Sequence, residues 1–216
     1  MLAKRLMFAA SFLVLAFSTN ALAQSADVSF VAAAPFVSDS NANVLVICPG
    51  PTCPLAPNKI VTSHEVFLEG TVAVRTLNLK AASLHLEVPF AGLPSQKLTL
   101  SSSPSTVIGH MSSVFITPSF RLKVAPGAPI APWISLGGGW ARYSASAGPT
   151  TNKGALQYGG GVDFKTGIPF LGLRGEVRDF VTGSPNFPTS ILFNTPTQGG
   201  LNRHNVLAGG GAVFSF

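Results

Sequence analysis

The chain has 216 residues and a formal net charge of +6, with 46% hydrophobic residues and only 10% charged ones. Soluble domains carry about 25% charged residues, so the composition argues against an ordinary soluble domain. The Lys and Arg residues are scattered rather than clustered, which argues against a nucleic-acid-binding protein.

The N-terminus has the three parts of a secretory signal peptide. Lys4 and Arg5 give a positive start, an apolar run follows, and Ala21-Leu22-Ala23 is a small-x-small cleavage motif. The apolar run is too short for a membrane-spanning helix, which takes about 20 residues. We therefore predict a signal peptide at 1–23, cleaved between Ala23 and Gln24, and one exported domain at 24–216.

Two cysteines lie close together in the proline-rich segment CPGPTC. Export permits disulfides, so we predict a local disulfide between Cys48 and Cys53. A two-thiolate metal site is the weaker alternative, because the nearest histidine is His64. A disulfide that closes so short a loop would mainly stiffen it.

Eight stretches alternate apolar and polar residues with a period of two, as strands do when one face meets lipid and the other a barrel lumen. They lie at about 27–37, 64–76, 82–90, 112–124, 132–145, 154–166, 171–181 and 204–216. Each suits the roughly 9–11 residues that a tilted strand needs to cross a membrane. An apolar chain without a helical span can meet lipid as a closed barrel, which satisfies its backbone hydrogen bonds between strands. We therefore predict an all-β fold, an eight-stranded antiparallel up-and-down transmembrane β-barrel.

The connections between these stretches alternate in length. The longer ones are 38–63, 91–111, 146–153 and 182–204, and the shorter ones are 77–81, 125–131 and 167–170. Outer-membrane barrels have long extracellular loops and short periplasmic turns. The alternation therefore predicts that both chain termini lie in the periplasm.

Three stretches contain a Gly-Gly-Gly run, at 137–139, 159–161 and 209–211. A phosphate-binding loop would need a following Lys-Ser/Thr pair and a βαβ context, and the sequence offers neither. We expect these glycines to relieve crowding in a strongly coiled, narrow barrel.

Ten charged residues fall on the parity that faces the lumen: Glu69, Arg75, Glu87, Arg121, Lys123, Asp163, Lys165, Arg174, Glu176 and Arg178. The interior of an eight-stranded barrel is just wide enough for side chains, and buried charges must be paired. We therefore predict an interlocked charge network in the lumen, including a cross-strand pair between Asp163 and Arg174. A narrow conducting path or proton relay is the alternative.

Aromatic girdles are expected where a barrel wall meets the lipid headgroups. We place Trp133, Phe164, Phe214 and Phe216 at the periplasmic boundary, and Phe90, Trp140, Tyr143, Tyr158 and Phe180 at the outer one. The alternative is ordinary core packing in a soluble barrel.

Three segments carry a resemblance to a known family: PWISLGGGWARYS (132–144), GALQYGGGVDFKTGIPFLGLRGEVRDF (154–180) and HNVLAGGGAVFSF (204–216). They resemble the outer-membrane protein β-barrel domain family, the OmpA/OmpX-like eight-stranded barrels with opacity-protein-like members. In that family the barrel-assembly machinery recognises a terminal aromatic residue, and Phe216, with Phe214 and Ala212 in phase, matches this signal. OmpA-type proteins often continue into a peptidoglycan-binding domain, and the sequence stops at the barrel, so wall anchoring is not implied.

The resemblance implies a monomer in the outer membrane, surrounded by outer-membrane lipid and lipopolysaccharide. We expect a structural or adhesion-like role through the loops, no cofactor and no enzymatic activity. A lipid-modifying enzyme is one alternative, with His110 and its neighbouring serines as the Ser/His-rich patch and Asp179 as a distant acid. The others are a narrow channel and a soluble lipocalin-like periplasmic barrel, which would keep its charges outside.

Overall fold

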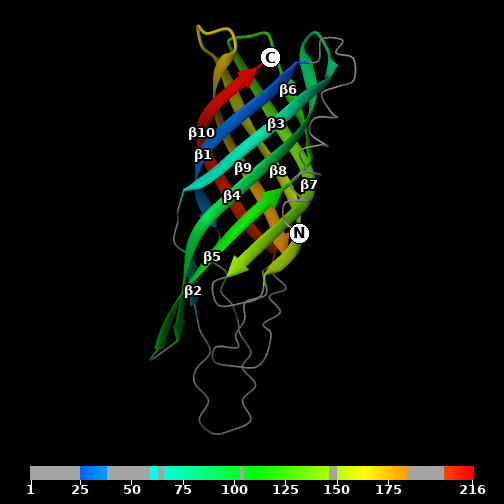
Figure 1. The fold of residues 1–216 in the computed structure, drawn as a ribbon. Helices are drawn as coiled ribbons and strands as arrows, with labels where there is room; N and C mark the ends of the chain where they lie inside the picture. Colours follow the sequence, from blue (N-terminus) through cyan, green and yellow to red (C-terminus); the bar gives the residue numbers. More distant parts are fainter. Residues whose placement is uncertain (1–24, 38–58, 63–65, 103–104, 146–149, 184–201) are drawn as a thin grey trace, which may run out of the picture.

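One antiparallel sheet closes on itself to form a barrel in the computed structural model, which describes residues 25–37, 59–62, 66–102, 105–145, 150–183 and 202–216 (Figure 1). The described strands are β1 (Ala26–Val37), β2 (Lys59–Thr62), β3 (Phe67–Asn78), β4 (Ala82–Ser102), β5 (Ser105–Ile116), β6 (Ser119–Val124), β7 (Ile130–Ala145), β8 (Thr151–Lys165), β9 (Leu171–Gly183) and β10 (Asn202–Ser215). The signal peptide, its cleavage site at Ala23 and Gln24, and Cys48 and Cys53 lie outside these residues, so the predictions for them stay predictions.

Closure comes from β1, which pairs with β10 on one side and with β3 on the other. Strands β5 and β6 act as a single wall strand, because both pair with β4 and with β7. The break between them falls at Thr117 and Pro118, and a proline has no N–H to give to the sheet. The wall therefore has eight strands, each beside its neighbour in sequence. The predicted eight-stranded antiparallel up-and-down barrel is confirmed.

The predicted long loop at 91–111 is wrong. Strands β4 and β5 continue through most of it as a paired hairpin, which projects beyond the barrel wall in Figure 1. Within the predicted loop 38–63, β2 pairs with the outer part of β4. A register shift between Leu93 and Gln96 breaks the alternation there. Because of this break and of the Ser- and Thr-rich composition, the outer parts of β4 and β5 lack the period-two alternation by which strands were predicted.

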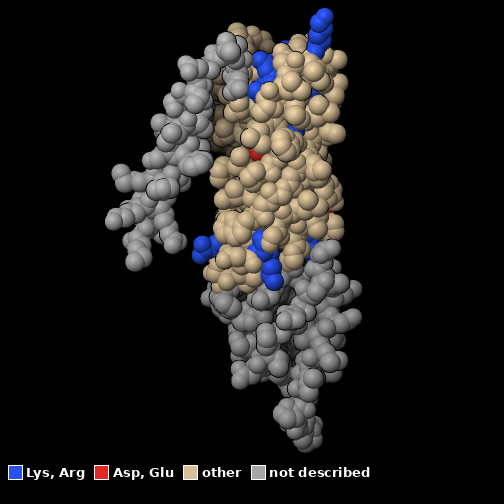
Figure 2. Space-filling view, turned by 90° about the vertical axis from the view of Figure 1, so that its right-hand side faces the viewer, with Lys and Arg blue, Asp and Glu red and all other residues tan. Residues whose placement is uncertain are grey.

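The two faces of the wall have opposite chemistry. Phe120 and Ile134 are 60% and 64% exposed on the outside, whereas Arg121 is fully buried on the inside. Figure 2 shows a broad wall surface that is almost free of charged residues, with Lys and Arg gathered mainly toward its two ends and a small acidic spot between them. A soluble lipocalin-like barrel would show the reverse arrangement, so that alternative is wrong for the described residues. None of these residues forms a helix that is long and apolar enough to span a membrane.

Inward-facing glycines allow the wall to coil tightly. A Cβ atom at Gly211 would collide with the carbonyl oxygen of Phe30 in β1, and one at Gly139 with that of Ile116 in β5. The neighbouring strands therefore approach more closely at these positions than any side chain permits. This agrees with the structural role predicted for the glycine runs.

Candidate functional site

The barrel lumen contains two layers of different chemistry. We call the end of the barrel at which β1 begins and β10 ends the proximal end, and the opposite end the distal end. Charged side chains fill the proximal half, whereas aromatic and aliphatic side chains fill most of the distal half, with the buried Arg203 beside Tyr143. Both layers come from inward-facing positions of the same strands, so a single alternation of inward and outward residues supplies the side chains of both layers.

Asp163 in β8 is the centre of one group of ion pairs. Its Oδ1 atom accepts from Arg174 Nε at 2.7 Å, and its Oδ2 atom lies 2.7 Å from Lys123 Nζ. The indole Nε1 of Trp133 also donates to Oδ1, at 3.2 Å. Asp163 and Arg174 are direct partners in the pairing of β8 with β9. The structure thus contains the cross-strand pair that the short 167–170 turn predicts.

Arg178 in β9 joins three glutamates from three strands. Its Nη1 atom lies 2.8 Å from Glu87 Oε1, and its Nε atom lies 3.2 Å from Glu69 Oε1 and 3.3 Å from Glu176 Oε1. All four side chains are buried. One guanidinium can satisfy several carboxylates because its donors form a rigid planar fork.

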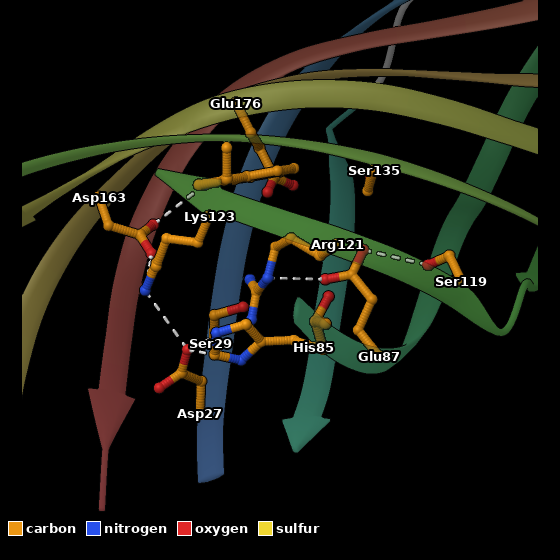
Figure 3. A network of polar contacts seen from close by, with 12 residues as sticks. Asp27, Ser29, His85, Glu87, Ser119, Arg121, Lys123, Ser135, Asp163 and Glu176 are labelled. Carbon is orange, nitrogen blue, oxygen red and sulfur yellow. Dashed lines mark hydrogen bonds and ion pairs between the residues drawn. The ribbon is translucent and has the colours of Figure 1, made fainter. Parts of the chain in front are cut away.

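Arg121 in β6 connects this group to the proximal mouth (Figure 3). Its Nε atom lies 3.3 Å from Glu87 Oε2, and its Nη2 atom lies 3.3 Å from Asp27 Oδ2. Lys123 lies between Asp27 and Asp163 and contacts both carboxylates. The result is one continuous network, as expected for charges that have been removed from water.

Trp133 lies among the three arginines of the network. The guanidinium carbons of Arg178, Arg174 and Arg121 lie 5.0, 5.1 and 5.5 Å from the centre of its ring. Arginine is attracted to the face of an indole ring at such distances. Gly161 is the partner of Trp133 in β8, and a Cβ atom there would collide with the ring. Trp133 was predicted at the lipid boundary, but it lies in the lumen and shares the parity of inward-facing Ser135.

Eight of the ten predicted charged residues take part in these contacts; Arg75 and Lys165 do not appear in them. Lys165 is exposed at the end of β8, where its Nζ atom donates to the carbonyl of Gly127 at 2.7 Å, so its predicted place in a buried network is wrong. Arg75 is half-buried and lines the proximal mouth. Asp27 was missed as a network member; it shares the inward parity of Ser29.

The distal layer is an aromatic cluster. Phe115 lies 5.1 Å from Phe180 and 5.9 Å from Tyr143, and Phe67 lies 6.2 Å from Phe180, between ring centres. Their exposed fractions do not exceed 2%. The Tyr143 hydroxyl forms a 2.6 Å hydrogen bond with Thr182. The cluster therefore fills the lumen without requiring charge pairing.

Three of the predicted girdle residues are in the lumen instead of the lipid boundary. Trp133, Tyr143 and Phe180 are buried at inward-facing positions. Their positions near the strand ends predicted a girdle. Whether a side chain points to lipid or to the lumen, however, depends on its parity along the strand. Phe90, Trp140, Tyr158, Phe164 and Phe216 are exposed on the wall, as a girdle requires.

Comparison with protein-family models and with curated proteins finds no match to the sequence. Among solved structures, the outer membrane protein OprG from Pseudomonas aeruginosa is similar, with a TM-score of 0.58 and 12% identity over 90% of this chain and 96% of that chain. AlkL, determined by solid-state NMR in lipid bilayers, is similar with a TM-score of 0.52 and 15% identity over 92% of this chain and 93% of that chain. This is the fold of the eight-stranded outer-membrane barrels. Identities this low carry the fold and nothing finer.

The closing strand of this outer-membrane barrel fold seals against the first. Phe214 is paired with Val28, and Ala212 with Phe30. Phe216 donates its backbone N–H to the carbonyl of Ala26 at 2.9 Å, while its side chain is 73% exposed. The aromatic terminus is therefore part of the seam, with its ring available on the outside.

Outside the lumen, the barrel has a polar cluster on its wall. Asp179 Oδ2 accepts from the Tyr158 hydroxyl at 2.7 Å and lies 2.6 Å from His204 Nδ1. The enzyme alternative combined Asp179 with His110, whereas the structure pairs Asp179 with His204. Among the described residues, no group of three or more His, Cys, Asp and Glu side chains is arranged to hold a metal ion.

Proposed function

We propose that this chain is an integral outer-membrane protein whose filled barrel is a structural scaffold for surface-contact loops. The apolar exterior supports contact with lipid and lipopolysaccharide, since lipid-facing positions of such barrels are apolar. In the proposed orientation, the proximal end faces the periplasm and the long connections face the outside. The proposed unit is a monomer, because closure of the wall leaves no sheet edge within the barrel.

The observation that carries this proposal is the filled lumen. The charge network and the aromatic cluster occupy its two halves with buried side chains. A filled interior favours a scaffold over a wide pore. Rigid scaffolds commonly carry their specificity in loops, which is why we assign surface contact to the connections rather than to the lumen.

Replacement of residues 184–201 with a short Gly-Ser-Gly connection tests the scaffold role. We expect the shortened protein to insert and to keep its heat-modifiable migration in detergent gels. Cells that produce it should lose the surface binding or envelope resistance that the full-length protein confers. A second variant has the 38–58 connection shortened in the same way. If cells that produce either variant keep the surface binding and the envelope resistance, the proposed role of the loops is contradicted.

The proposed role of Phe216 is in assembly rather than in the finished wall. Its exposed ring at the strand end is compatible with capture by the barrel-assembly machinery. Removal of Phe216 should lower the yield of inserted protein in cells, while protein refolded in detergent should show the same heat stability. Normal insertion in cells would contradict this role.

We also propose that the barrel is not an enzyme. The wall cluster pairs His204 with Asp179, but its third member is the phenol of Tyr158, which already donates to that carboxylate. Nucleophilic catalysis needs a nucleophile activated by the base. Mass spectrometry of lipid A should show the same acylation in cells with and without the protein, and a mass change abolished by His204→Gln would contradict this proposal.

A further inference from the structure

The proximal end of the barrel is hollowed into a cavity of about 320 Å³. Its floor contains the charged side chains of Asp27, Lys123 and Asp163, together with His85. Its rim is apolar on one side, where Ile168 and Phe170 of the turn between β8 and β9 lie. Since a water molecule occupies about 30 Å³ in the liquid, the cavity has room for about ten non-hydrogen atoms.

The floor is rigidly held by contacts deeper in the lumen. The side chains of Asp27, Lys123 and Asp163 are 5%, 10% and 8% exposed, and each belongs to the network shown in Figure 3. Preorganised charges of this kind cost little reorganisation when they bind a ligand. The cavity is thus a built site rather than a shallow depression among mobile surface side chains.

His85 adds a polar atom that is buried without a hydrogen-bond partner. The residue is 3% exposed, and its Nε2 atom lies 2.9 Å from the hydroxyl of Ser83. Its Nδ1 atom has no hydrogen bond to any residue that the structure describes, and it lies 3.9 Å from Asp27 Oδ2, which is too far for one. Buried polar atoms are nearly always satisfied by a partner, so this nitrogen has a hydrogen bond left for a water molecule or a ligand atom.

The charges around the cavity favour an anion. Asp27 already contacts Arg121 and Lys123, and Asp163 already contacts Arg174 and Lys123. Arg75 and Lys165 bring two further cationic side chains to the lining, with no additional Asp or Glu. Positive groups therefore outnumber carboxylates at this mouth. Three cationic side chains and two carboxylates line the cavity, and this excess of positive charge favours anions over cations.

We propose that the proximal cavity binds a small amphiphilic anion. Its anionic group would lie against Lys123, Arg75 and Lys165, and its apolar part would pack against Ile168 and Phe170 of the 167–170 turn. In the tautomer whose Nε2 atom accepts from the Ser83 hydroxyl, the Nδ1–H group of His85 would donate to the anionic group. This site is independent of the scaffold role, because the cavity lies at the end of the barrel opposite the long connections.

Phenyl phosphate is a suitable probe because it has 11 non-hydrogen atoms, about the size that the cavity accepts. We expect calorimetry on the refolded full domain in octyl glucoside micelles to detect saturable binding of phenyl phosphate. Benzylammonium has the opposite charge and a similar ring, and it should bind at least about tenfold more weakly, since like charges repel in such a cleft. Equal affinity for the two probes, or partitioning without saturation, would overturn the proposal.

Variants at the rim test where the probe binds. Arg75→Gln and Lys165→Gln should each weaken phenyl phosphate binding by about two- to fivefold, as expected for the loss of a partly exposed charge contact. Lys80→Gln is the matched control, because Lys80 is exposed in the neighbouring turn after β3 and does not line the cavity. Heat-modifiable migration should be unchanged in all three. An equal loss for Lys80→Gln, or no loss for the two rim variants, would overturn this site.

Discussion

The two halves of the lumen are built from the same strands but stabilised in different ways. In the proximal half, Arg178 and Arg121 each serve more than one carboxylate, so each member depends on several others. In the distal half, the rings of Phe67, Phe115 and Phe180 contact one another without polar requirements. Removal of one charge leaves its partners uncompensated, whereas removal of one ring leaves only a cavity. The charge network should therefore be the less tolerant half.

The largest effect is expected for Arg178→Met. Three buried glutamates would lose their shared cation, and we expect the free energy of unfolding to fall by about 4 to 5 kcal/mol. Urea titration of the barrel in lipid vesicles, followed by the gel shift of unfolded protein, measures this change. Addition of Glu87→Gln to the variant should restore part of the loss. A loss below about 1 kcal/mol, the value of a surface ion pair, would contradict the claim that the three buried glutamates depend on Arg178.

A somewhat smaller effect is expected for Phe180→Ala in the aromatic cluster. We expect a loss of about 3 to 4 kcal/mol, because the ring is fully buried and its removal leaves a cavity. Phe180→Leu is the matched control and should retain most of the stability, since it keeps an apolar side chain of similar size. The same urea titration applies, and equal losses for the two variants would show that the cluster depends on ring contacts rather than on filled volume.

Asp163→Asn sharpens the comparison within the charged half. The carboxylate would be replaced by a neutral group of the same shape, so the contacts to Arg174, Lys123 and Trp133 would weaken. We expect a loss of about 2 kcal/mol, typical for hydrogen bonds to charged groups, because Lys123 keeps its contact with Asp27 and Arg174 keeps its hydrogen bond to Ser29. Trp133 fluorescence should also change, because its indole donates to this residue. An unchanged stability and spectrum would contradict the assigned contacts; Trp140→Phe should be introduced first to remove the second indole.

The smallest effect is expected for Lys165→Gln. This side chain shares the inward parity of Asp163, but it is exposed beyond the wall and donates to one carbonyl. Exposed substitutions of this kind change stability by no more than about 0.5 kcal/mol. A loss comparable to that of Asp163→Asn in the same urea titration would show that Lys165 belongs to the network after all.

Parity in the sequence was enough to predict the wall, the register and most of the lumen charges. Asp163 and Arg174 were predicted as partners because a short turn leaves one register that keeps both faces consistent. The hairpin beyond the wall was missed because a register shift after Leu93 breaks the alternation. Parity along one strand also cannot say which side chains meet across the lumen, so the gathering of three arginines around Trp133 required the closed barrel.

The most direct test of a filled lumen is a planar-bilayer recording of the refolded barrel. With both layers in place, we predict no steady ohmic openings for the wild-type protein. The comparison is a triple variant that removes side chains from both layers: Phe115→Ala, Trp133→Ala and Phe180→Ala. The inserted triple variant should show a larger ion flux than the wild-type protein. Steady ohmic openings of the wild-type barrel would contradict the account and support the narrow channel instead.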